Sequence, residues 1–241
     1  MDDHINRTYG EHLAEVYDKW FGACEAEAIE LLAGFARGGR ALELGIGTGR
    51  MALPLAAKGI EVEGIDAAPA MVAKLRERSG SDAIKVTMGN FADVDVTGRF
   101  TLIFIVFNTF FALLTQEEQV RCFRNVAEHL TDDGVFVLEA FVPDVARFTG
   151  GHNLRVYTVN QERASLQAAE HDPVLQRMFT QNIVFTEAGV NLYPVEIRYA
   201  WPTELDLMAQ LAGLKLRNRW ANWSQETFTA TSEKHVSVYE R

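Results

Sequence analysis

The feature that most constrains the fold is a glycine-rich loop at residues 43–50, with the sequence ELGIGTGR. It follows a short apolar run over residues 40–44 that is typical of a buried strand, and it precedes a helical segment. Gly45, Gly47 and Gly49 allow a tight turn and let a ligand approach the backbone. The start of the following helix directs free N–H groups toward a negative or polar ligand. The loop therefore predicts a ligand site between the first strand and the first helix of a strand–helix unit.

An acidic residue, Asp66, ends the next predicted strand, 17 residues beyond Gly49. A carboxylate at this place typically accepts hydrogen bonds from ribose hydroxyls. Asp66 could also act as a helix cap, but its position at the end of a strand favours the ribose interpretation. The order of these features, from the first strand through the glycine loop, the helix and the second strand to Asp66, predicts a nucleoside site at the carboxyl edge of a parallel sheet.

Strands and helices alternate along most of the chain, which favours an α/β layer fold. The run Thr101 to Phe107 is apolar enough to be buried on both faces, as parallel strands are. Thr115 and Glu118 have the spacing of a capping box at the start of the clearest helix. We predict a Rossmann-like, seven-stranded, mostly parallel sheet with helices on both faces. Its strands are expected at residues 40–44, 60–65, 83–88, 101–107, 135–141, 214–220 and 235–240.

The pattern changes after Pro143, where no parallel unit is recognisable. Residues 175–187 and 190–201 indicate two strands joined at Ala188-Gly189, so we expect a small antiparallel β insertion after the fifth strand. The predicted domains are a ligand-binding domain over residues 1–142 and 202–241 and a lid over residues 143–201. Tyr193, Val195, Ile197, Tyr199 and Trp201 fall on one face at a period of two, which is more typical of packing than of a pocket wall.

The glycine spacing separates two kinds of nucleoside-binding loop. The dinucleotide fingerprint GxGxxG needs a third glycine at position 50, where this chain has Arg50. The spacing GxGxG after Glu43 instead resembles motif I of the class I S-adenosylmethionine-dependent methyltransferases. Further segments resemble theirs in the same order, at residues 66–71, 89–91 and 107–109, and in the closing helix and two strands.

The resemblance implies a cofactor, S-adenosyl-L-methionine, and a set of residues that bind it. The segment Val16-Tyr17-Asp18 is similar to the start of bacterial sugar N,N-dimethyltransferases and their relatives, in which an N-terminal helix folds over the cofactor. In these proteins a small antiparallel insertion covers the acceptor pocket. The implied cofactor-binding residues are Tyr17, Glu43, Gly45, Gly47, Gly49, Asp66, Ala67, Met71, Asn90, Phe91 and Phe107.

The methyl acceptor and the catalytic residue are less constrained. The run after the fourth strand, Asn108-Thr109-Phe110-Phe111, has no Pro-Pro, unlike methyltransferases of planar amides and amino-bases. It also has no histidine where the sugar N,N-dimethyltransferases carry one, and its apolar character favours a partly hydrophobic acceptor. We expect methylation of an O or N atom. Candidate substrate residues are Asn108, Phe111, Phe141 and Tyr199, and candidates for a polar catalytic role are His12, Tyr17 and Asn108.

Methyl transfer from a sulfonium depends mainly on proximity and alignment, so no catalytic base is assigned. Tyr17 is equally compatible with packing against the core, and Asn108 is equally compatible with a turn. Two other function classes stay open: an NAD(P)-dependent oxidoreductase and a non-catalytic S-adenosylmethionine-binding subunit.

The composition excludes several partners and sites. The formal net charge of −10 argues against nucleic acid and against an anionic membrane surface as partners. Cys24 and Cys122 do not form a disulfide framework or a zinc site, and the carboxylates near the fourth and fifth strands do not make a metal set, so no metal is expected. The segment Met1 to His4 does not resemble a signal peptide. We expect a cytoplasmic monomer or homodimer that acts on a small molecule.

Overall fold

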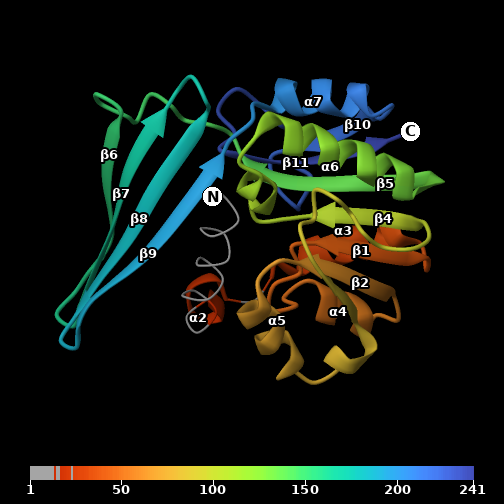
Figure 1. Ribbon diagram of the computed structural model, residues 1–241, viewed down its shortest axis with the longest axis horizontal. Coiled ribbons are helices and arrows are strands. Elements are labelled where there is room, and N and C mark those ends of the chain that lie inside the picture. The colour runs from red at the N-terminus through yellow and green to blue at the C-terminus, as the bar shows by residue number, and fades with distance from the viewer. Residues whose placement is uncertain (1–13, 15–16, 23) are drawn as a thin grey trace.

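The computed structural model describes residues 14, 17–22 and 24–241. Its main sheet has seven strands in the order β10-β11-β5-β4-β1-β2-β3 (Figure 1). Strands β1 to β5 are parallel to one another, whereas β11 is antiparallel to both β5 and β10. The strands are β1 (Arg40–Leu44), β2 (Glu61–Asp66), β3 (Lys85–Met88), β4 (Phe100–Ile105), β5 (Leu130–Phe141), β10 (Lys215–Trp220) and β11 (Lys234–Glu240).

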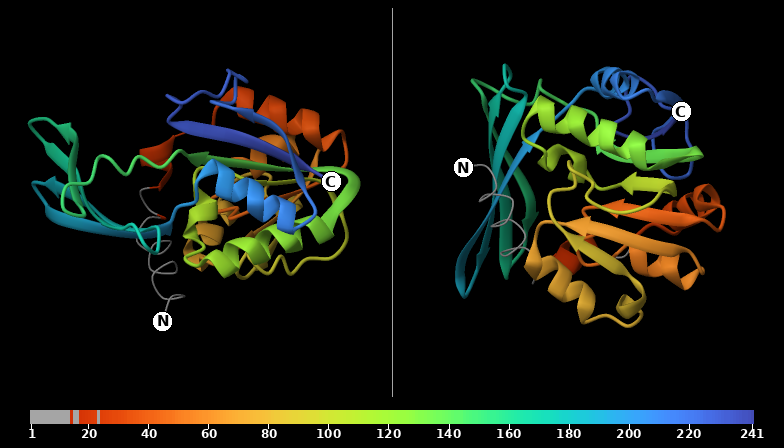
Figure 2. Two further views of the ribbon diagram at one scale, coloured as in Figure 1. Left: turned by 90° about the horizontal axis from the view of Figure 1, so that it is seen from above. Right: turned by 45° about the vertical axis from the view of Figure 1, so that its right-hand side comes forward.

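Helices cover both faces of this sheet (Figure 2). On one face, α3 (Ala26–Ala36) and α4 (Ala52–Ala57) pack with Leu32 and Leu55 in one apolar cluster. On the other face, α6 (Gln116–His129) and α7 (Pro202–Leu211) pack around Phe123 in a second cluster. The remaining helices are α2 (Tyr17–Phe21) and α5 (Pro69–Arg76), with short 3₁₀ turns η1 (Ser81–Ala83) and η2 (Thr109–Ala112). The predicted fold class is confirmed.

The insertion after β5 is a second, four-stranded antiparallel sheet in the order β6-β7-β8-β9. It stands beside the carboxyl edge of the main sheet (Figure 1), and we call it the lid sheet. Its strands are β6 (His152–Val159), β7 (Arg163–Asp172), β8 (Arg177–Thr186) and β9 (Gly189–Arg198). The antiparallel insertion is confirmed, but the expectation of two strands was wrong. The strands β6 and β7 were missed because β6 is mostly exposed and β7 mixes small and polar side chains, so neither has a clear apolar alternation.

Several strand ends differ from the prediction, including those of β3, β4 and β5. Strand β5 differs most, because it starts at Leu130 and not at residue 135. Helix α7 starts at Pro202 after an N-cap Trp201 that makes no side-chain capping bond. The capping box of α6 is confirmed, with Thr115 and Glu118 bonded reciprocally. Within the described residues, none of the helices is long and apolar enough to cross a membrane.

Candidate active site

A cavity of about 1170 Å³ lies between the carboxyl edge of the main sheet and the inner face of the lid sheet. One side is formed by the loops after β1, β2, β3 and β4, and by α2. The other side is formed by the lid strands and by Arg147 in the connection that leads to them. The cavity thus combines a loop-lined half on the main sheet with a second half under the lid.

The glycine loop is fastened to the end of β2 by its backbone. The N–H groups of Gly45 and Ile46 both donate to the carbonyl of Ile65, at 2.8 and 3.0 Å. Gly45 and Gly47 have φ angles of 74° and 54°, in the left-handed region that favours glycine. A Cβ on Gly45 would also collide with the Cγ2 atom of Thr109. The loop therefore needs glycine both for its turn and for its close packing under η2.

Asp66 is held at the cavity wall by two backbone donors. Its carboxylate accepts the N–H of Gly47 at 2.7 Å and the N–H of Ala68 at 2.8 Å. Burial raises the pKa of Asp66, although these hydrogen bonds act in the opposite direction. Each oxygen keeps a second lone pair, so a correctly placed carboxylate remains available to ligand hydroxyls.

Glu43 lies next to this site but outside the cavity wall. Its side chain is buried, and its Oε2 atom has no hydrogen-bond donor among the described residues. Burial raises the pKa of Glu43 well above its ordinary value, and the Arg50 charge offsets this only in part. The Arg50 guanidinium lies over the Phe107 ring, 4.3 Å from its centroid. Glu43 and Asp66 together concentrate acidic groups beside the loop.

Helix α2 is tied to the glycine loop through Asp18. The Thr48 hydroxyl donates to Asp18 at 2.8 Å, and Arg78 pairs with the same carboxylate. This places Tyr17 and Trp20 in the cavity wall. Burial raises the pKa of Tyr17 to about 12, so the phenol is protonated at neutral pH.

The turn after β4 is held in a strained conformation. Phe107 and Asn108 are consecutive and have φ angles of 59° and 66°, which non-glycine residues rarely adopt. The Phe107 N–H donates to Glu139 at 3.0 Å, and the Phe141 N–H donates to the Asn108 side-chain oxygen at 2.7 Å. Glu139 also accepts the Trp223 indole N–H at 3.0 Å. The amide oxygen of Asn108 is thus used to fix the turn.

The lid contributes a polar ladder to the cavity. The Tyr157 hydroxyl donates to Gln167 at 3.3 Å, and the Gln167 amide donates to Asn182 at 3.0 Å. Near the base of the lid, Arg147 lies over the Phe148 ring and contacts the sulfur of Met178 at 3.6 Å. The space under the lid is therefore mixed, with polar groups set among apolar ones.

The structure brings most of the predicted residues together. Of the expected cofactor set, Glu43 and Gly49 lie behind the wall, and the other members line the cavity. Asn108 and Phe141 line it as well. Phe111 is fully buried against Phe141, and Tyr199 is buried with its hydroxyl bonded to His171 at 2.9 Å, so their positions favour packing. His12 lies outside the described residues.

Sequence reasoning missed the wall residues that come from the lid and from α2. They include Trp20, Arg147, Tyr157, Arg163, Ser165, Gln167, Met178, Thr180 and Asn182. Val195 and Ile197 were noticed as one face of a strand, yet they line the cavity rather than a closed core. In the described part of the chain, no cluster of three or more His, Cys, Asp and Glu side chains has a metal-binding arrangement.

The fold and this wall define a class of protein. A seven-stranded sheet of this topology, with a GxGxG loop and an acid after β2 at one cavity, is the arrangement of a class I methyltransferase. The described residues fit a nucleoside cofactor with cationic groups, because the loop excludes Cβ atoms and a buried carboxylate oxygen of Glu43 lacks a donor.

Comparisons with known proteins agree with this class. A methyltransferase domain family matches residues 41–134. The structure of the CcbJ methyltransferase from Streptomyces caelestis superposes with a TM-score of 0.91, at 39% identity and with 98% of each chain covered. The cypemycin N-terminal methyltransferase of Streptomyces sp is 27% identical over 83% of this chain and 82% of its own. The fold is shared with CalS10, an amino pentose methyltransferase from Micromonospora echinaspora, at 22% identity, a TM-score of 0.69 and coverage of 94% and 96%.

The chain therefore belongs to the class I S-adenosylmethionine-dependent methyltransferases of the small-molecule type.

Proposed function

We propose that the protein binds S-adenosylmethionine along the main-sheet half of the cavity and methylates a small, partly hydrophobic molecule under the lid. The observation that carries this proposal is the position of Asp66, which two backbone N–H groups hold beside the glycine loop. Bound there, the cofactor supplies an electrophilic methyl group on a positively charged sulfur. Asp66 would bind the ribose hydroxyls, and Glu43 and Asp66 would stabilise the cofactor's cationic groups.

Between the two acceptor atoms, nitrogen is favoured. The cypemycin relative is an N-terminal methyltransferase, and CalS10 acts on an amino pentose. Among the apolar side chains Leu113, Phe141 and Met178, an amine is favoured in its neutral, nucleophilic form because burial disfavours the charged form. The nitrogen lone pair forms a bond to the methyl carbon as the carbon–sulfur bond breaks, and a proton is then released to water.

The chain contributes alignment rather than a strong base. The Glu139 and Asn108 bonds fix the turn after β4, and Tyr17 stays protonated beside the loop. Holding donor and acceptor in line is the main contribution that such a site can make to the rate. A lid that excludes water adds to this by removing a competing nucleophile.

Calorimetry with S-adenosylhomocysteine tests the cofactor site, with Asp66→Asn as the variant and Asp132→Asn as its matched control. Asp132 is exposed and pairs with Arg99 at the far end of the sheet. We expect saturable binding by the wild type and by the control, and at least a tenfold loss in Asp66→Asn, or about 1.4 kcal/mol. Absence of binding by the wild type would refute the proposal.

A panel of amines, phenols and carboxylates, with S-adenosylhomocysteine release as the readout, then tests catalysis by the chain alone. Turnover of an amine supports the proposal and removes the alternative of a non-catalytic subunit. If S-adenosylhomocysteine is released with phenols and not with amines, the methylated atom is oxygen instead.

A further inference from the structure

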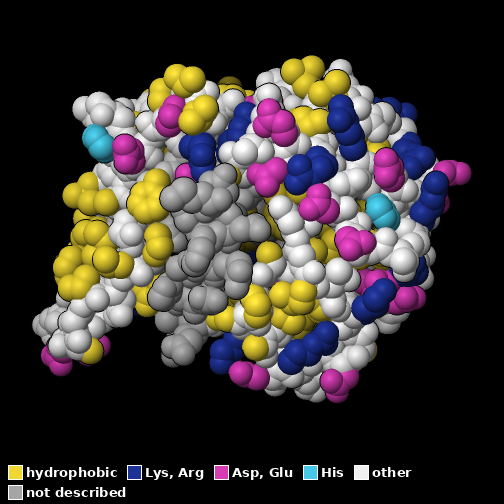
Figure 3. Space-filling model, viewed as in Figure 1, with side chains coloured by type: hydrophobic (Ala, Val, Ile, Leu, Met, Phe, Trp, Pro, Cys, Tyr) yellow, Lys and Arg dark blue, Asp and Glu magenta, His cyan; other side chains and the backbone are white. Residues whose placement is uncertain are grey.

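The charged side chains in the cavity wall differ from those on the outer surface in how they are paired. On the face of the molecule shown in Figure 3, acidic and basic side chains are mixed. Among the described residues, the Asp, Glu, Lys and Arg side chains of the cavity wall are Asp66, Glu118, Glu196, Arg147 and Arg163.

Each of the three acids in the wall has a partner within the chain. Asp66 accepts two backbone N–H groups, and Glu118 is bonded in the capping box of α6. Glu196 is ion-paired with Arg177 at 2.7 Å. These acids are therefore not available to neutralise the arginines of the wall.

The two arginines lack such partners. In the described part of the chain, the Nε atoms of Arg147 and Arg163 are buried without a hydrogen-bond acceptor, and neither guanidinium is paired with a carboxylate. The cavity thus carries unneutralised positive charge in a chain whose net charge is −10. This contrast points to a negatively charged group on a ligand.

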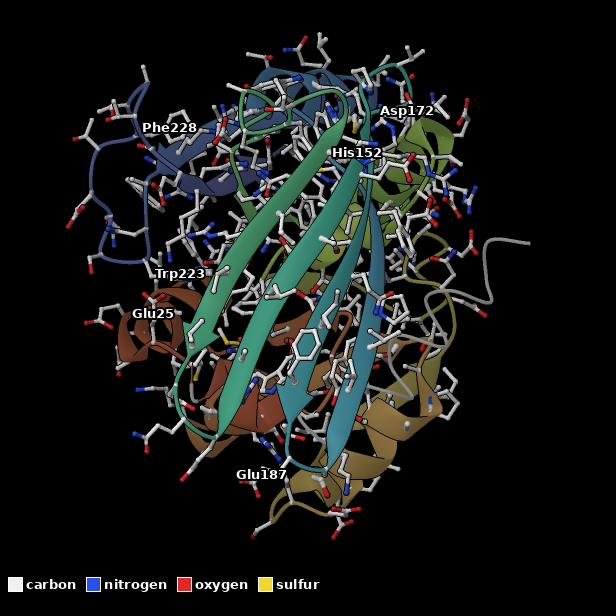
Figure 4. The ribbon with its side chains drawn as sticks, turned by 90° about the vertical axis from the view of Figure 1, so that its left-hand side faces the viewer. Glu25, His152, Asp172, Glu187, Trp223 and Phe228 are labelled. Carbon is white, nitrogen blue, oxygen red and sulfur yellow. The ribbon has the colours of Figure 1, made fainter. Side chains whose placement is uncertain are left out.

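The two arginines lie at opposite ends of the lid. Arg163 begins β7 and lies over the Trp20 ring, 5.8 Å from its centroid. Arg147 contacts Met178, which pairs with His171 near the other end of β7. Along the strand these ends are about 27 Å apart at about 3.4 Å per residue, and Figure 4 views the full length of the lid strands between them. The two arginines therefore cannot hold one small anion together.

Arg147 is the arginine beside the proposed acceptor, and the chain holds it in place. The side-chain amide of Asn153 donates to the Arg147 carbonyl at 2.9 Å, and the Phe148 N–H donates to the carbonyl of Val145 at 3.3 Å. The guanidinium lies over the Phe148 ring, 4.9 Å from its centroid, and 3.6 Å from the sulfur of Met178. Its position is thus set by contacts within the lid connection and the lid.

These contacts leave most of the hydrogen-bonding capacity of Arg147 unused. A guanidinium has five N–H donors, whereas a thioether sulfur is a weak acceptor. Within the described residues, no oxygen accepts a hydrogen bond from this guanidinium. Because Arg147 lines the cavity, a ligand there can supply the missing acceptor.

We propose that the methyl acceptor carries a carboxylate in addition to its amine, and that Arg147 binds this carboxylate. The inference rests on the proposed function, because that function places the acceptor under the lid. Two parallel N–H···O bonds from one guanidinium fix both the distance and the orientation of a carboxylate. Arg147 is then a substrate-binding residue that selects acceptors by their charge.

A carboxylate matches this site better than a phosphate does. It carries one negative charge, which one guanidinium neutralises. A phosphate monoester carries about two negative charges at neutral pH. The second charge would lie near Phe141 and Met178, where a charge without a partner is costly to bury.

Calorimetric titration of the protein loaded with S-adenosylhomocysteine tests the inference with two matched probes, para-aminomethylbenzoate and para-aminomethylbenzamide. We expect the wild type to bind the benzoate roughly tenfold more tightly, because hydrogen bonds to an ionised group are the stronger ones. Arg147→Gln should abolish this preference. Arg147→Lys keeps the charge without the planar fork and should retain part of it. Arg124→Gln, exposed on α6 and outside the cavity wall, is the control and should bind both probes as the wild type does.

Equal affinity of the wild type for the two probes, including no detectable binding of either, would overturn the inference. A preference that Arg147→Gln retains would overturn it as well, and so would tighter binding of the corresponding arylphosphonate than of the benzoate. Binding of S-adenosylhomocysteine is measured first on every variant, which also shows that the cofactor half is folded. A chain that binds S-adenosylhomocysteine without preferring the benzoate loses only the carboxylate site, whereas a wild type that does not bind it loses the proposed function.

Discussion

At the scale of single residues, the buried carboxyl of Glu43 is costly to the fold. Burial raises its pKa well above the ordinary value of 4.5 because the ionised form loses its hydration, and Arg50 offsets this only in part. A carboxyl with a raised pKa destabilises the folded state wherever it is ionised. The cost is present in full above the folded pKa and disappears as the pH falls to the ordinary value.

Glu43→Gln should therefore melt at a higher temperature than the wild type at pH 8, and this gain should shrink as the pH is lowered toward 4.5. Each kcal/mol recovered corresponds to roughly 2–4 °C in a chain of this size. Cofactor affinity should fall at the same time, since the substitution removes a negative charge. Thermal unfolding between pH 8 and pH 4 is the measurement, with Glu61→Gln, an exposed side chain at the start of β2, as control. A gain in melting temperature that does not depend on pH would contradict the raised pKa of Glu43.

The loop residues were predictable because their constraint is local. Gly45, Gly47 and Asp66 follow strands that the sequence marks clearly, and the glycine spacing alone specifies the turn. The substrate role expected for Phe111 and Tyr199 stays a prediction, because periodicity gives a face but not what that face meets. Both are held by aromatic neighbours from segments distant in sequence.

At the scale of elements, the lid is joined to the main domain by a buried polar cluster. Arg198, at the end of β9, donates to Glu204 on α7 at 2.7 Å and to Gln176 at 3.1 Å, and it also bonds Gln119 on α6. Gln116 donates to Glu204 as well, at 3.0 Å. Burial raises the pKa of Glu204, but the hydrogen bonds from Arg198, Gln176 and Gln116 outweigh it, and the net pKa is lowered.

A carboxyl with a lowered pKa contributes stability above its ordinary value of 4.5 and loses it as the pH falls through the lower folded value. Glu204→Gln should therefore lower the melting temperature at pH 7 and flatten its decline in acid. Glu187→Gln, in the turn between β8 and β9, is the matched control and should leave the profile unchanged. If the melting temperatures of the wild type and of Glu204→Gln fell equally steeply in acid, the stability of the cluster would not depend on this charge.

The lid also marks the limit of what element patterns reveal. Residues 175–201 gave two strands because apolar side chains alternate there, whereas β6 and β7 are polar or exposed at many positions. A sheet that faces a cavity on one side and an exposed surface on the other lacks the contrast that marks a buried strand.

At the scale of the whole molecule, Glu139 connects regions that are far apart in the chain. Its two carboxylate oxygens accept the Phe107 N–H, 32 residues away, and the Trp223 indole, 84 residues away. Lys234 also lies 3.6 Å from one of them. No sequence pattern indicates such a link, although the alternation of elements predicted the mostly parallel sheet that makes it possible.

Glu139→Gln keeps one acceptor for two buried donors, so one N–H loses its partner at a cost of about 1–3 kcal/mol. We expect lower thermal stability and weaker binding of S-adenosylhomocysteine, because the Phe107–Asn108 turn loosens. In the double variant with Trp223→Phe, the remaining amide oxygen serves Phe107 alone. The stability losses of the two single variants should then add up to more than the loss measured for the double variant. If the losses are instead additive within about 0.5 kcal/mol, the two residues are not coupled in this way.

The same link bears on the order in which the protein is made. Strand β11 comes after β10 in the chain, yet it lies between β5 and β10 in the sheet. The turn beside the glycine loop is braced by Glu139 on β5 and, through it, by Trp223. A nascent chain on the ribosome can form the glycine loop and β1 to β4 early, but the edge of β5 that pairs with β11 stays open until residues 234–240 emerge. The loop half of the cavity can therefore form before the strand and the Trp223 contact that support it.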